Sequence, residues 1–162
     1  MSNQGDKLVH IKRCIQLIQL EIGNVTRISN LYLSPSWGFE SDDFYNCALL
    51  LETSKTPQQV LEGLHEIEEK MGRAKKAGEG YEARVIDIDI VSFNDKILDF
   101  DNLKIPHPQL QNRLFVLLPL RDVRPNYSHP VLHKNINELI NECEDTGICQ
   151  PISDLELPSE GN

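Results

Sequence analysis

The stretch RVIDIDIV at residues 84–91 is the most informative part of this chain, because charged and branched apolar residues alternate along it. Alternate side chains of a β-strand point to opposite faces, so the pattern predicts a strand with one acidic face and one apolar face. Asp87 and Asp89 then lie side by side. Neighbouring carboxylates repel each other unless a cation bridges them, and Mg²⁺ prefers oxygen ligands, so this pair is a candidate magnesium site. The alternative is an edge strand whose two aspartates face solvent.

Length and charge limit the classes of protein to consider. The 162 residues suit one domain with a single core, and the net charge of −9 argues against nucleic acid as the main partner. There is no signal-peptide pattern and no long apolar run, so we expect a cytoplasmic protein that binds no membrane. The polar composition from Gln150 onward predicts one domain over residues 1–149 and a frayed tail over residues 150–162.

Hydrophobic periodicity predicts the elements on either side of the aspartates. Their order of helix, strand, strand, helix and strand fits an α+β sandwich, in which two helices cover one face of a mostly antiparallel sheet. In chain order we expect a helix at residues 5–22, strands at 25–33 and 44–53, a helix that Thr56 caps and that ends at Gly72, the aspartate-bearing strand, and helices at 114–118 and 136–142.

Seven short motifs occur in one order along the chain: SNQGD (2–6), YLSPSWG (32–38), FYN (44–46), Glu68 to Arg73, RxxDxDI (84–90), IPHP (105–108) and NRxF (112–115). With these motifs, the chain from Ser2 to about Val123 resembles the bacterial 6-hydroxymethyl-7,8-dihydropterin pyrophosphokinases. The resemblance implies a ferredoxin-like α/β sandwich. It also implies transfer of the β,γ-diphosphate of ATP to a reduced pterin, with release of AMP, in tetrahydrofolate synthesis.

The resemblance also implies roles for individual residues, with two Mg²⁺ ions and ATP at one side of the site and the pterin at the other. The catalytic residues it implies are Asp87, Asp89, Arg84 and Arg73, of which the two aspartates are also the metal ligands. The ATP-binding residues it implies are His65, Glu68, Arg73, Lys75, Arg84, Ile90, Lys104, His107 and Arg113. The pterin-binding residues it implies are Ser34, Pro35, Trp37, Phe44, Asn46 and Phe115, with Phe44 and Phe115 as the stacking pair. We expect a monomer.

Taken singly, these residues have simpler explanations. Phe115 lies in an aliphatic run and suits core packing, Asn46 suits an edge strand, and His107 lies between two prolines of a loop. The cations that begin at Arg73 follow a helix, where they would complement its C-terminal dipole. The combined pattern favours the site over these separate explanations.

The front of the chain departs from the family pattern. Members begin with a short apolar strand that leads into Gly-Ser-Asn, whereas this chain begins Met1-Ser2-Asn3. We therefore expect the first strand of the sheet to be missing and the true start to lie upstream. In a ferredoxin-like sheet that strand is central, so its loss would expose the edges of its neighbours. Two alternatives stay open: a truncated, non-catalytic homologue that binds pterin or nucleotide, and a different Mg-dependent transferase with a DxD pair.

Overall fold

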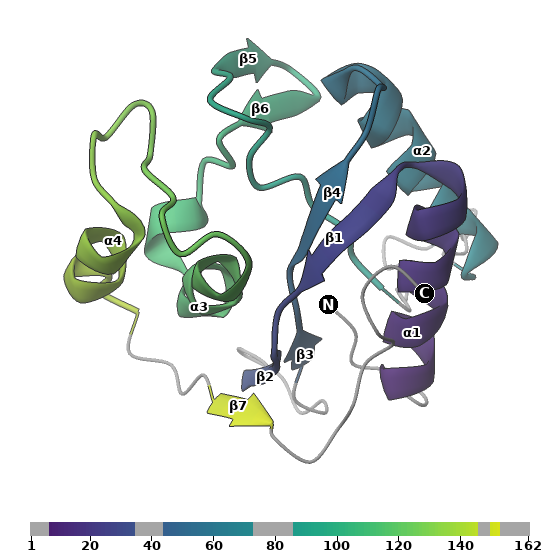
Figure 1. Cartoon of the computed structure of the whole chain (residues 1–162), viewed down its shortest axis with the longest axis horizontal. Helices are drawn as coiled ribbons and strands as arrows, with labels where there is room; N and C mark the ends of the chain where they lie inside the picture. Colours follow the sequence, from purple (N-terminus) through teal and green to yellow (C-terminus); the bar gives the residue numbers. More distant parts are fainter. Residues whose placement is uncertain (1–6, 35–43, 73–85, 146–149, 153–162) are drawn as a thin grey trace, which may run out of the picture.

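The computed structural model describes residues 7–34, 44–72, 86–145 and 150–152, which form α-helices and short antiparallel strands. This composition is an α+β fold, as the sequence predicts. In chain order (Figure 1) the elements are α1 (Lys7–Glu21), β1 (Asn24–Ile28), β2 (Leu31–Ser34), β3 (Phe44–Asn46), β4 (Leu49–Glu52), α2 (Pro57–Lys70), β5 (Leu98–Phe100), β6 (Leu103–Ile105), the 3₁₀-helix η1 (Leu110–Asn112), α3 (Leu114–Val123), α4 (Ile136–Glu142) and β7 (Gln150–Ile152).

The described strands form three small antiparallel sheets. Strand β1 pairs with β4, β2 lies between β3 and β7, and β5 pairs with β6. The two long strands predicted at residues 25–33 and 44–53 are each divided in two. The division falls where Ser29 faces Ala48: the Ala48 N–H donates to the Ser29 hydroxyl at 2.7 Å. The Ser29 side chain therefore takes the Ala48 N–H, which would bond to a backbone carbonyl if the strand pairing were continuous.

The segment with the two aspartates is not a strand over the described residues 86–91, so that prediction is wrong there. A strand needs a neighbouring backbone, whereas the Ile88 N–H donates to Oε2 of Glu68 at 2.9 Å. The two-sided pattern is nevertheless retained. Ile86, Ile88 and Ile90 all pack into the core beneath α1 and α2.

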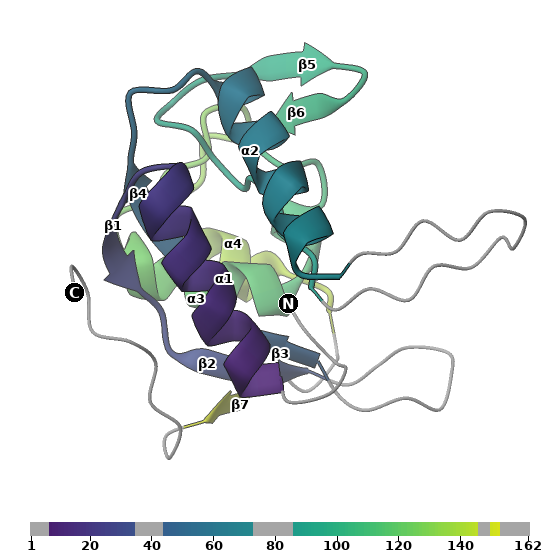
Figure 2. The same ribbon diagram turned by 90° about the vertical axis from the view of Figure 1, so that its right-hand side faces the viewer.

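Helices cover both sides of the β1–β4 pair, with α1 and α2 on one side and α3 and α4 on the other (Figures 1 and 2). The sequence predicted helices on one face only. The reason for the difference is that the apolar side chains of strand β4 and of the residue before it point alternately to both faces of the strand pair. Leu49 and Leu51 pack against the core with α1 and α2, and Ala48 and Leu50 pack against the core with α3 and α4.

The start of α2 follows the sequence prediction closely. The Thr56 side chain accepts the Gln59 N–H, the Gln59 side chain accepts the Thr56 N–H, and Pro57 occupies the first turn. The helix ends before Gly72, whose φ of 99° lies in the left-handed region that glycine tolerates best. These local signals fix the helix that carries His65 and Glu68.

The sequence predicted a tail from Gln150, whereas residues 150–152 pair with β2 as strand β7. None of the helices in the described ranges has both the length and the apolar character to cross a membrane.

Candidate active site

Five of the predicted site residues lie outside the described residues: Pro35, Trp37, Arg73, Lys75 and Arg84. Apart from His65 on α2 and Lys104 in β6, the others lie around the aspartate-bearing segment, on the β2–β3 pair and at the start of α3. The positions of these residues show which parts of the predicted site lie close together in the fold.

The aspartate-bearing segment is anchored from beneath by α2. Glu68 is only 4 % exposed, and its carboxylate accepts the N–H of Ile88, the residue between the two aspartates. Asp87 is half-buried and Asp89 is exposed, while the isoleucines between and beside them face the core. Glu68, a predicted ATP ligand, thus anchors the backbone of the segment from below. Ile90, another residue that the family resemblance implied for ATP binding, packs against the core.

The loop after β6 brings a histidine and an arginine to the same segment. The His107 N–H donates to the Val91 carbonyl at 2.9 Å, which ties the loop to the end of the aspartate-bearing segment. Burial lowers the pKa of His107; nearby Asp89 raises this pKa and Arg113 lowers it, and the net shift is downward. The Nδ1 atom of His107 accepts the Gln109 N–H at 3.1 Å, so the neutral ring carries its proton on Nε2. The result is a neutral hydrogen-bond donor beside a carboxylate and a guanidinium.

The start of α3 joins the two halves of the predicted site. Arg113 is the residue before the helix, and its guanidinium carbon lies 5.7 Å from the ring centroid of Phe115 in the first turn. This distance is within the range of a cation–π contact. A predicted ATP ligand and a predicted pterin-stacking ring are therefore direct neighbours.

Strands β2 and β3 carry the other predicted pterin residues on one face. Ser34 lies opposite Phe44 in the register, and Asn46 lies opposite Tyr32. The Asn46 Nδ2 donates to the Ser34 hydroxyl at 2.8 Å, and both side chains are buried. Side chains directly opposite on paired strands share a face, so these groups form one polar and aromatic cluster.

Two predicted ATP ligands occupy separate positions. Lys104 lies in β6, where its ammonium group is 2.7 Å from the carboxylate of Asp99 in β5. His65 is exposed on α2, one turn before Glu68. The fold thus places Lys104 in the β5–β6 hairpin (Figure 1), where its exposed side chain pairs with Asp99.

The donor set for a metal is small. In the described part of the chain, no group of three or more histidine, cysteine, aspartate or glutamate side chains is arranged to hold a metal ion. The two aspartates supply carboxylate oxygens only. That set fits Mg²⁺, which commonly takes one or two protein carboxylates and completes its shell with water and substrate phosphates.

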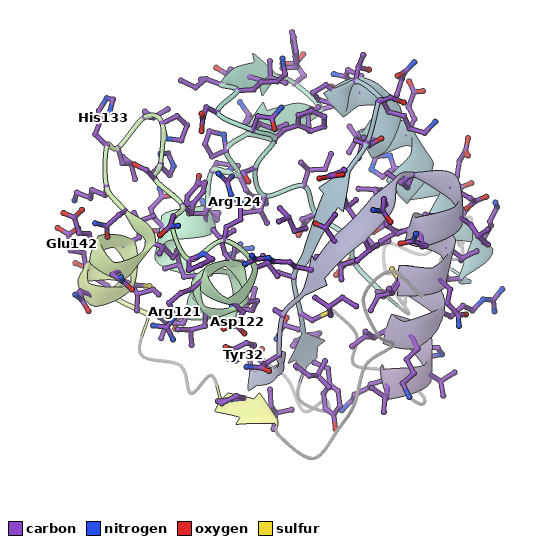
Figure 3. All side chains as sticks on the ribbon, in the orientation of Figure 1. Tyr32, Arg121, Asp122, Arg124, His133 and Glu142 are labelled. Carbon is purple, nitrogen blue, oxygen red and sulfur yellow. The ribbon has the colours of Figure 1, made fainter. Side chains whose placement is uncertain are left out.

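The sequence did not predict one long-range contact between β2 and α3. The Tyr32 hydroxyl donates to Oδ2 of Asp122 in α3 at 2.8 Å, across 90 residues of chain (Figure 3). A partial signal was present, since Tyr32 is two residues before Ser34 and Asp122 is seven residues after Phe115. Nothing in the sequence paired the two.

These features define an α+β protein in which a carboxylate-bearing segment lies beside a histidine, an arginine and an aromatic ring. Residues 2–125 match the family model of 7,8-dihydro-6-hydroxymethylpterin-pyrophosphokinase (HPPK). The chain therefore belongs to the HPPK family.

Three relatives illustrate the similarity. The chain is 36 % identical over 138 residues to the 2-amino-4-hydroxy-6-hydroxymethyldihydropteridine pyrophosphokinase of Aquifex aeolicus, covering 85 % of this chain and 84 % of that protein. It is 34 % identical over 156 residues to the Synechocystis protein of the same name, covering 96 % and 79 %. It is 40 % identical over 162 residues to the folic acid synthesis protein FOL1 of Dictyostelium discoideum, covering 99 % of this chain but only 22 % of FOL1.

Proposed function

We propose that this chain transfers the β,γ-diphosphate of ATP to the hydroxymethyl group of 6-hydroxymethyl-7,8-dihydropterin and releases AMP, as a step of tetrahydrofolate synthesis. The single observation that carries this proposal is that Asp89 and Arg113 both lie close enough to His107 to influence its pKa, while Arg113 packs on Phe115, in a member of the HPPK family. The names of the relatives from Aquifex and Synechocystis support the same activity.

In the proposed reaction the hydroxymethyl oxygen attacks the β-phosphorus of ATP. The bond from this phosphorus to the oxygen that bridges to the α-phosphate breaks, AMP leaves, and the hydroxyl proton is lost to solvent. Little covalent chemistry falls to the protein, so catalysis depends on positioning and on stabilising charge. Arg113 supplies a fixed positive charge, and the neutral His107 donates from Nε2 to a phosphate oxygen.

Asp87 and Asp89 are the residues that would hold magnesium, and we propose two ions there. When bound, the ions would neutralise and align the triphosphate. Glu68 keeps both carboxylates on the side away from the core by fixing the backbone between them. Arg73, Lys75 and Arg84 complete the proposed phosphate contacts, with Arg73 and Arg84 in catalytic roles, and His65, Ile90 and Lys104 complete the proposed ATP pocket.

The pterin would lie between α3 and the β2–β3 pair. Phe44 and Phe115 supply flat apolar surfaces, and offset stacking on such rings adds about 0.5–1.5 kcal/mol beyond area burial. Asn46, whose amide is held by Ser34, would recognise the polar edge of the heterocycle. Pro35 and Trp37 are proposed to line the same pocket.

The proposal extends to the state of the protein: a cytoplasmic monomer with one catalytic domain over residues 1–149. The family match and the relatives' names favour an active enzyme over the truncated, non-catalytic homologue. The Phe44, Asn46 and Phe115 set favours a flat heterocyclic acceptor over the sugar of a glycosyl transferase.

The test is release of AMP by the purified chain in the presence of ATP, Mg²⁺ and 6-hydroxymethyl-7,8-dihydropterin. We expect pterin-dependent AMP that falls by at least about a hundredfold in Asp87→Ala, as happens when a preorganised electrostatic contact is removed. Asp101→Ala is the matched control, because Asp101 is an exposed aspartate in the β5–β6 turn. A folded protein that binds pterin or nucleotide but forms no AMP would establish the non-catalytic alternative.

A further inference from the structure

The contact between Tyr32 and Asp122 joins two elements that carry opposite walls of the proposed pterin site. Oδ2 of Asp122 accepts the Tyr32 hydroxyl at 2.8 Å and the Asn30 N–H at 3.1 Å. One carboxylate oxygen on α3 therefore holds two donors at the beginning of β2. Figure 3 shows Tyr32 and Asp122 close together at this junction.

The two side chains lie on the faces that matter for the pterin. Tyr32 is opposite Asn46 in the β2–β3 register, so both project from the same face of that strand pair. On α3, Asp122 follows Phe115 by seven residues, which is two helical turns, so both lie along one side of the helix. At 1.5 Å per residue the two positions are about 10 Å apart along the axis.

From this arrangement we propose that Tyr32 and Asp122 are positioning residues, which set the separation between Phe115 and the Phe44–Asn46 wall of the pterin site. The inference rests on the proposed function, because the site it adjusts is the proposed pterin site. A flat heterocycle between two walls requires a defined separation. Displacement of a binding group by about 1 Å can cost on the order of a hundredfold in rate.

The hydrogen bond between Tyr32 and Asp122 is not sensitive to pH in the working range. Burial and the neighbouring Asp122 carboxylate raise the pKa of Tyr32 to about 12. The phenol therefore stays protonated and remains a donor at every pH at which the protein would work. Tyr32 is 4 % exposed, so water does not compete freely for its hydroxyl.

The chain offers a closely matched pair of variants for the test. Tyr32→Phe deletes a buried hydroxyl that has a partner. Tyr127→Phe deletes one that is equally buried, on a residue 1 % exposed, but that has no hydrogen-bond partner among the described residues. We expect Tyr32→Phe to raise the KM for the pterin about tenfold, less than the hundredfold that a displacement of about 1 Å can cost, and to leave the KM for ATP within about twofold. Tyr127→Phe should leave both values unchanged.

Asp122 provides a second, independent comparison. Asp122→Asn keeps an oxygen that accepts from Tyr32 and Asn30, so it should retain a pterin KM near that of the unmodified chain. Asp122→Ala removes the acceptor and should raise the pterin KM as Tyr32→Phe does. Thermal unfolding of each variant identifies the temperature at which all are folded, and the kinetics are compared there.

Direct titration of the chain with 6-hydroxymethyl-7,8-dihydropterin, in the presence of Mg²⁺ and a non-hydrolysable ATP analogue, separates failure of this inference from failure of the function. Weaker pterin binding with unchanged nucleotide binding in Tyr32→Phe and Asp122→Ala, but not in Tyr127→Phe, supports the positioning role. If the unmodified chain binds pterin and Tyr32→Phe binds it equally well, or weakens both ligands alike, the positioning role is wrong while the function stands. If the unmodified chain binds no pterin, the proposed function fails and this inference fails with it.

Discussion

Replacing Glu68 with alanine should destabilise the whole fold, although Glu68 lies on a helix whose charged neighbours are exposed. Glu68 is 4 % exposed, and its carboxylate accepts the Ile88 N–H at 2.9 Å. The alanine variant leaves this N–H without its acceptor, at a point where the flanking isoleucines hold the segment against the core. The backbone that carries Asp87 and Asp89 would lose its anchor to α2.

The expected loss of stability follows from the hydrogen bond between the Ile88 N–H and the Glu68 carboxylate. A hydrogen bond to a charged acceptor contributes about 1.5–3 kcal/mol to the free energy of unfolding. That is a large part of the roughly 5–15 kcal/mol by which domains are stable. For a chain of this length 1 kcal/mol shifts Tm by roughly 2–4 °C, so Glu68→Ala should lower Tm by roughly 3–12 °C.

Urea unfolding followed by far-UV circular dichroism measures the effect. Glu69→Ala is the matched control, because Glu69 is the next residue of α2 and is exposed. It makes the same change in helix propensity and should alter the free energy of unfolding by no more than about 0.5 kcal/mol. Glu68→Gln keeps an acceptor oxygen and should fall between the two. Hydrogen exchange at the Ile88 N–H should accelerate in Glu68→Ala.

Equal stability of Glu68→Ala and Glu69→Ala would refute the reasoning. It would mean that the cost of burying the carboxylate offsets the hydrogen bond, as can happen for buried charges. Unchanged exchange at Ile88 would show in addition that the N–H finds another acceptor.

Two further predictions concern stability. A Cβ at Gly23 would collide with the backbone oxygen of Glu52, whereas a Cβ at Gly63 would meet only the flexible end of Ile22. Gly23→Ala should therefore lower the free energy of unfolding by about 1–3 kcal/mol. Gly63→Ala should leave it unchanged or raise it by up to about 1 kcal/mol through helix propensity. Urea unfolding measures both values, and the reverse order would contradict this account. Burial lowers the pKa of His107 below its ordinary 6.5, so its contribution to stability is complete above that pH and is lost as the pH falls through the lowered value. His107→Gln should show a smaller loss of urea midpoint between about pH 7.5 and about pH 5.5 than the unmodified chain, and identical losses would assign the pH dependence to other groups.

Local signals in the sequence predicted the helices well. Thr56, Pro57 and Gln59 form the cap that the sequence indicates, and Gly72 has the backbone conformation that ends a helix. Such signals depend on neighbours within a few residues, so the sequence contains them in full. The alternating pattern of the aspartate-bearing segment correctly predicted which side chains face the core, because burial requires only that apolar residues recur at the right spacing.

The strand prediction for that segment was wrong because a strand depends on a partner strand, which is often distant in sequence. Here the Ile88 N–H bonds to a side chain of α2 instead. The same reason explains why Ser29 divides an expected strand, since its hydroxyl takes the Ala48 N–H. Alternation of apolar and charged residues indicates an extended segment with one buried and one exposed face. It does not identify the hydrogen-bond partners of the backbone.

The sequence by itself determined the α+β class, the helix ends and, through its motifs, the family to which this chain belongs. Only the tertiary structure decided that helices cover both sides of the β1–β4 pair, that Glu68 anchors the aspartate-bearing segment, and that Tyr32 meets Asp122 across 90 residues. The physical reason is range. Helix caps and side-chain alternation are set by hydrogen bonds and backbone geometry within a few residues, whereas a buried polar group takes whichever partner the packing of distant elements brings within hydrogen-bond distance.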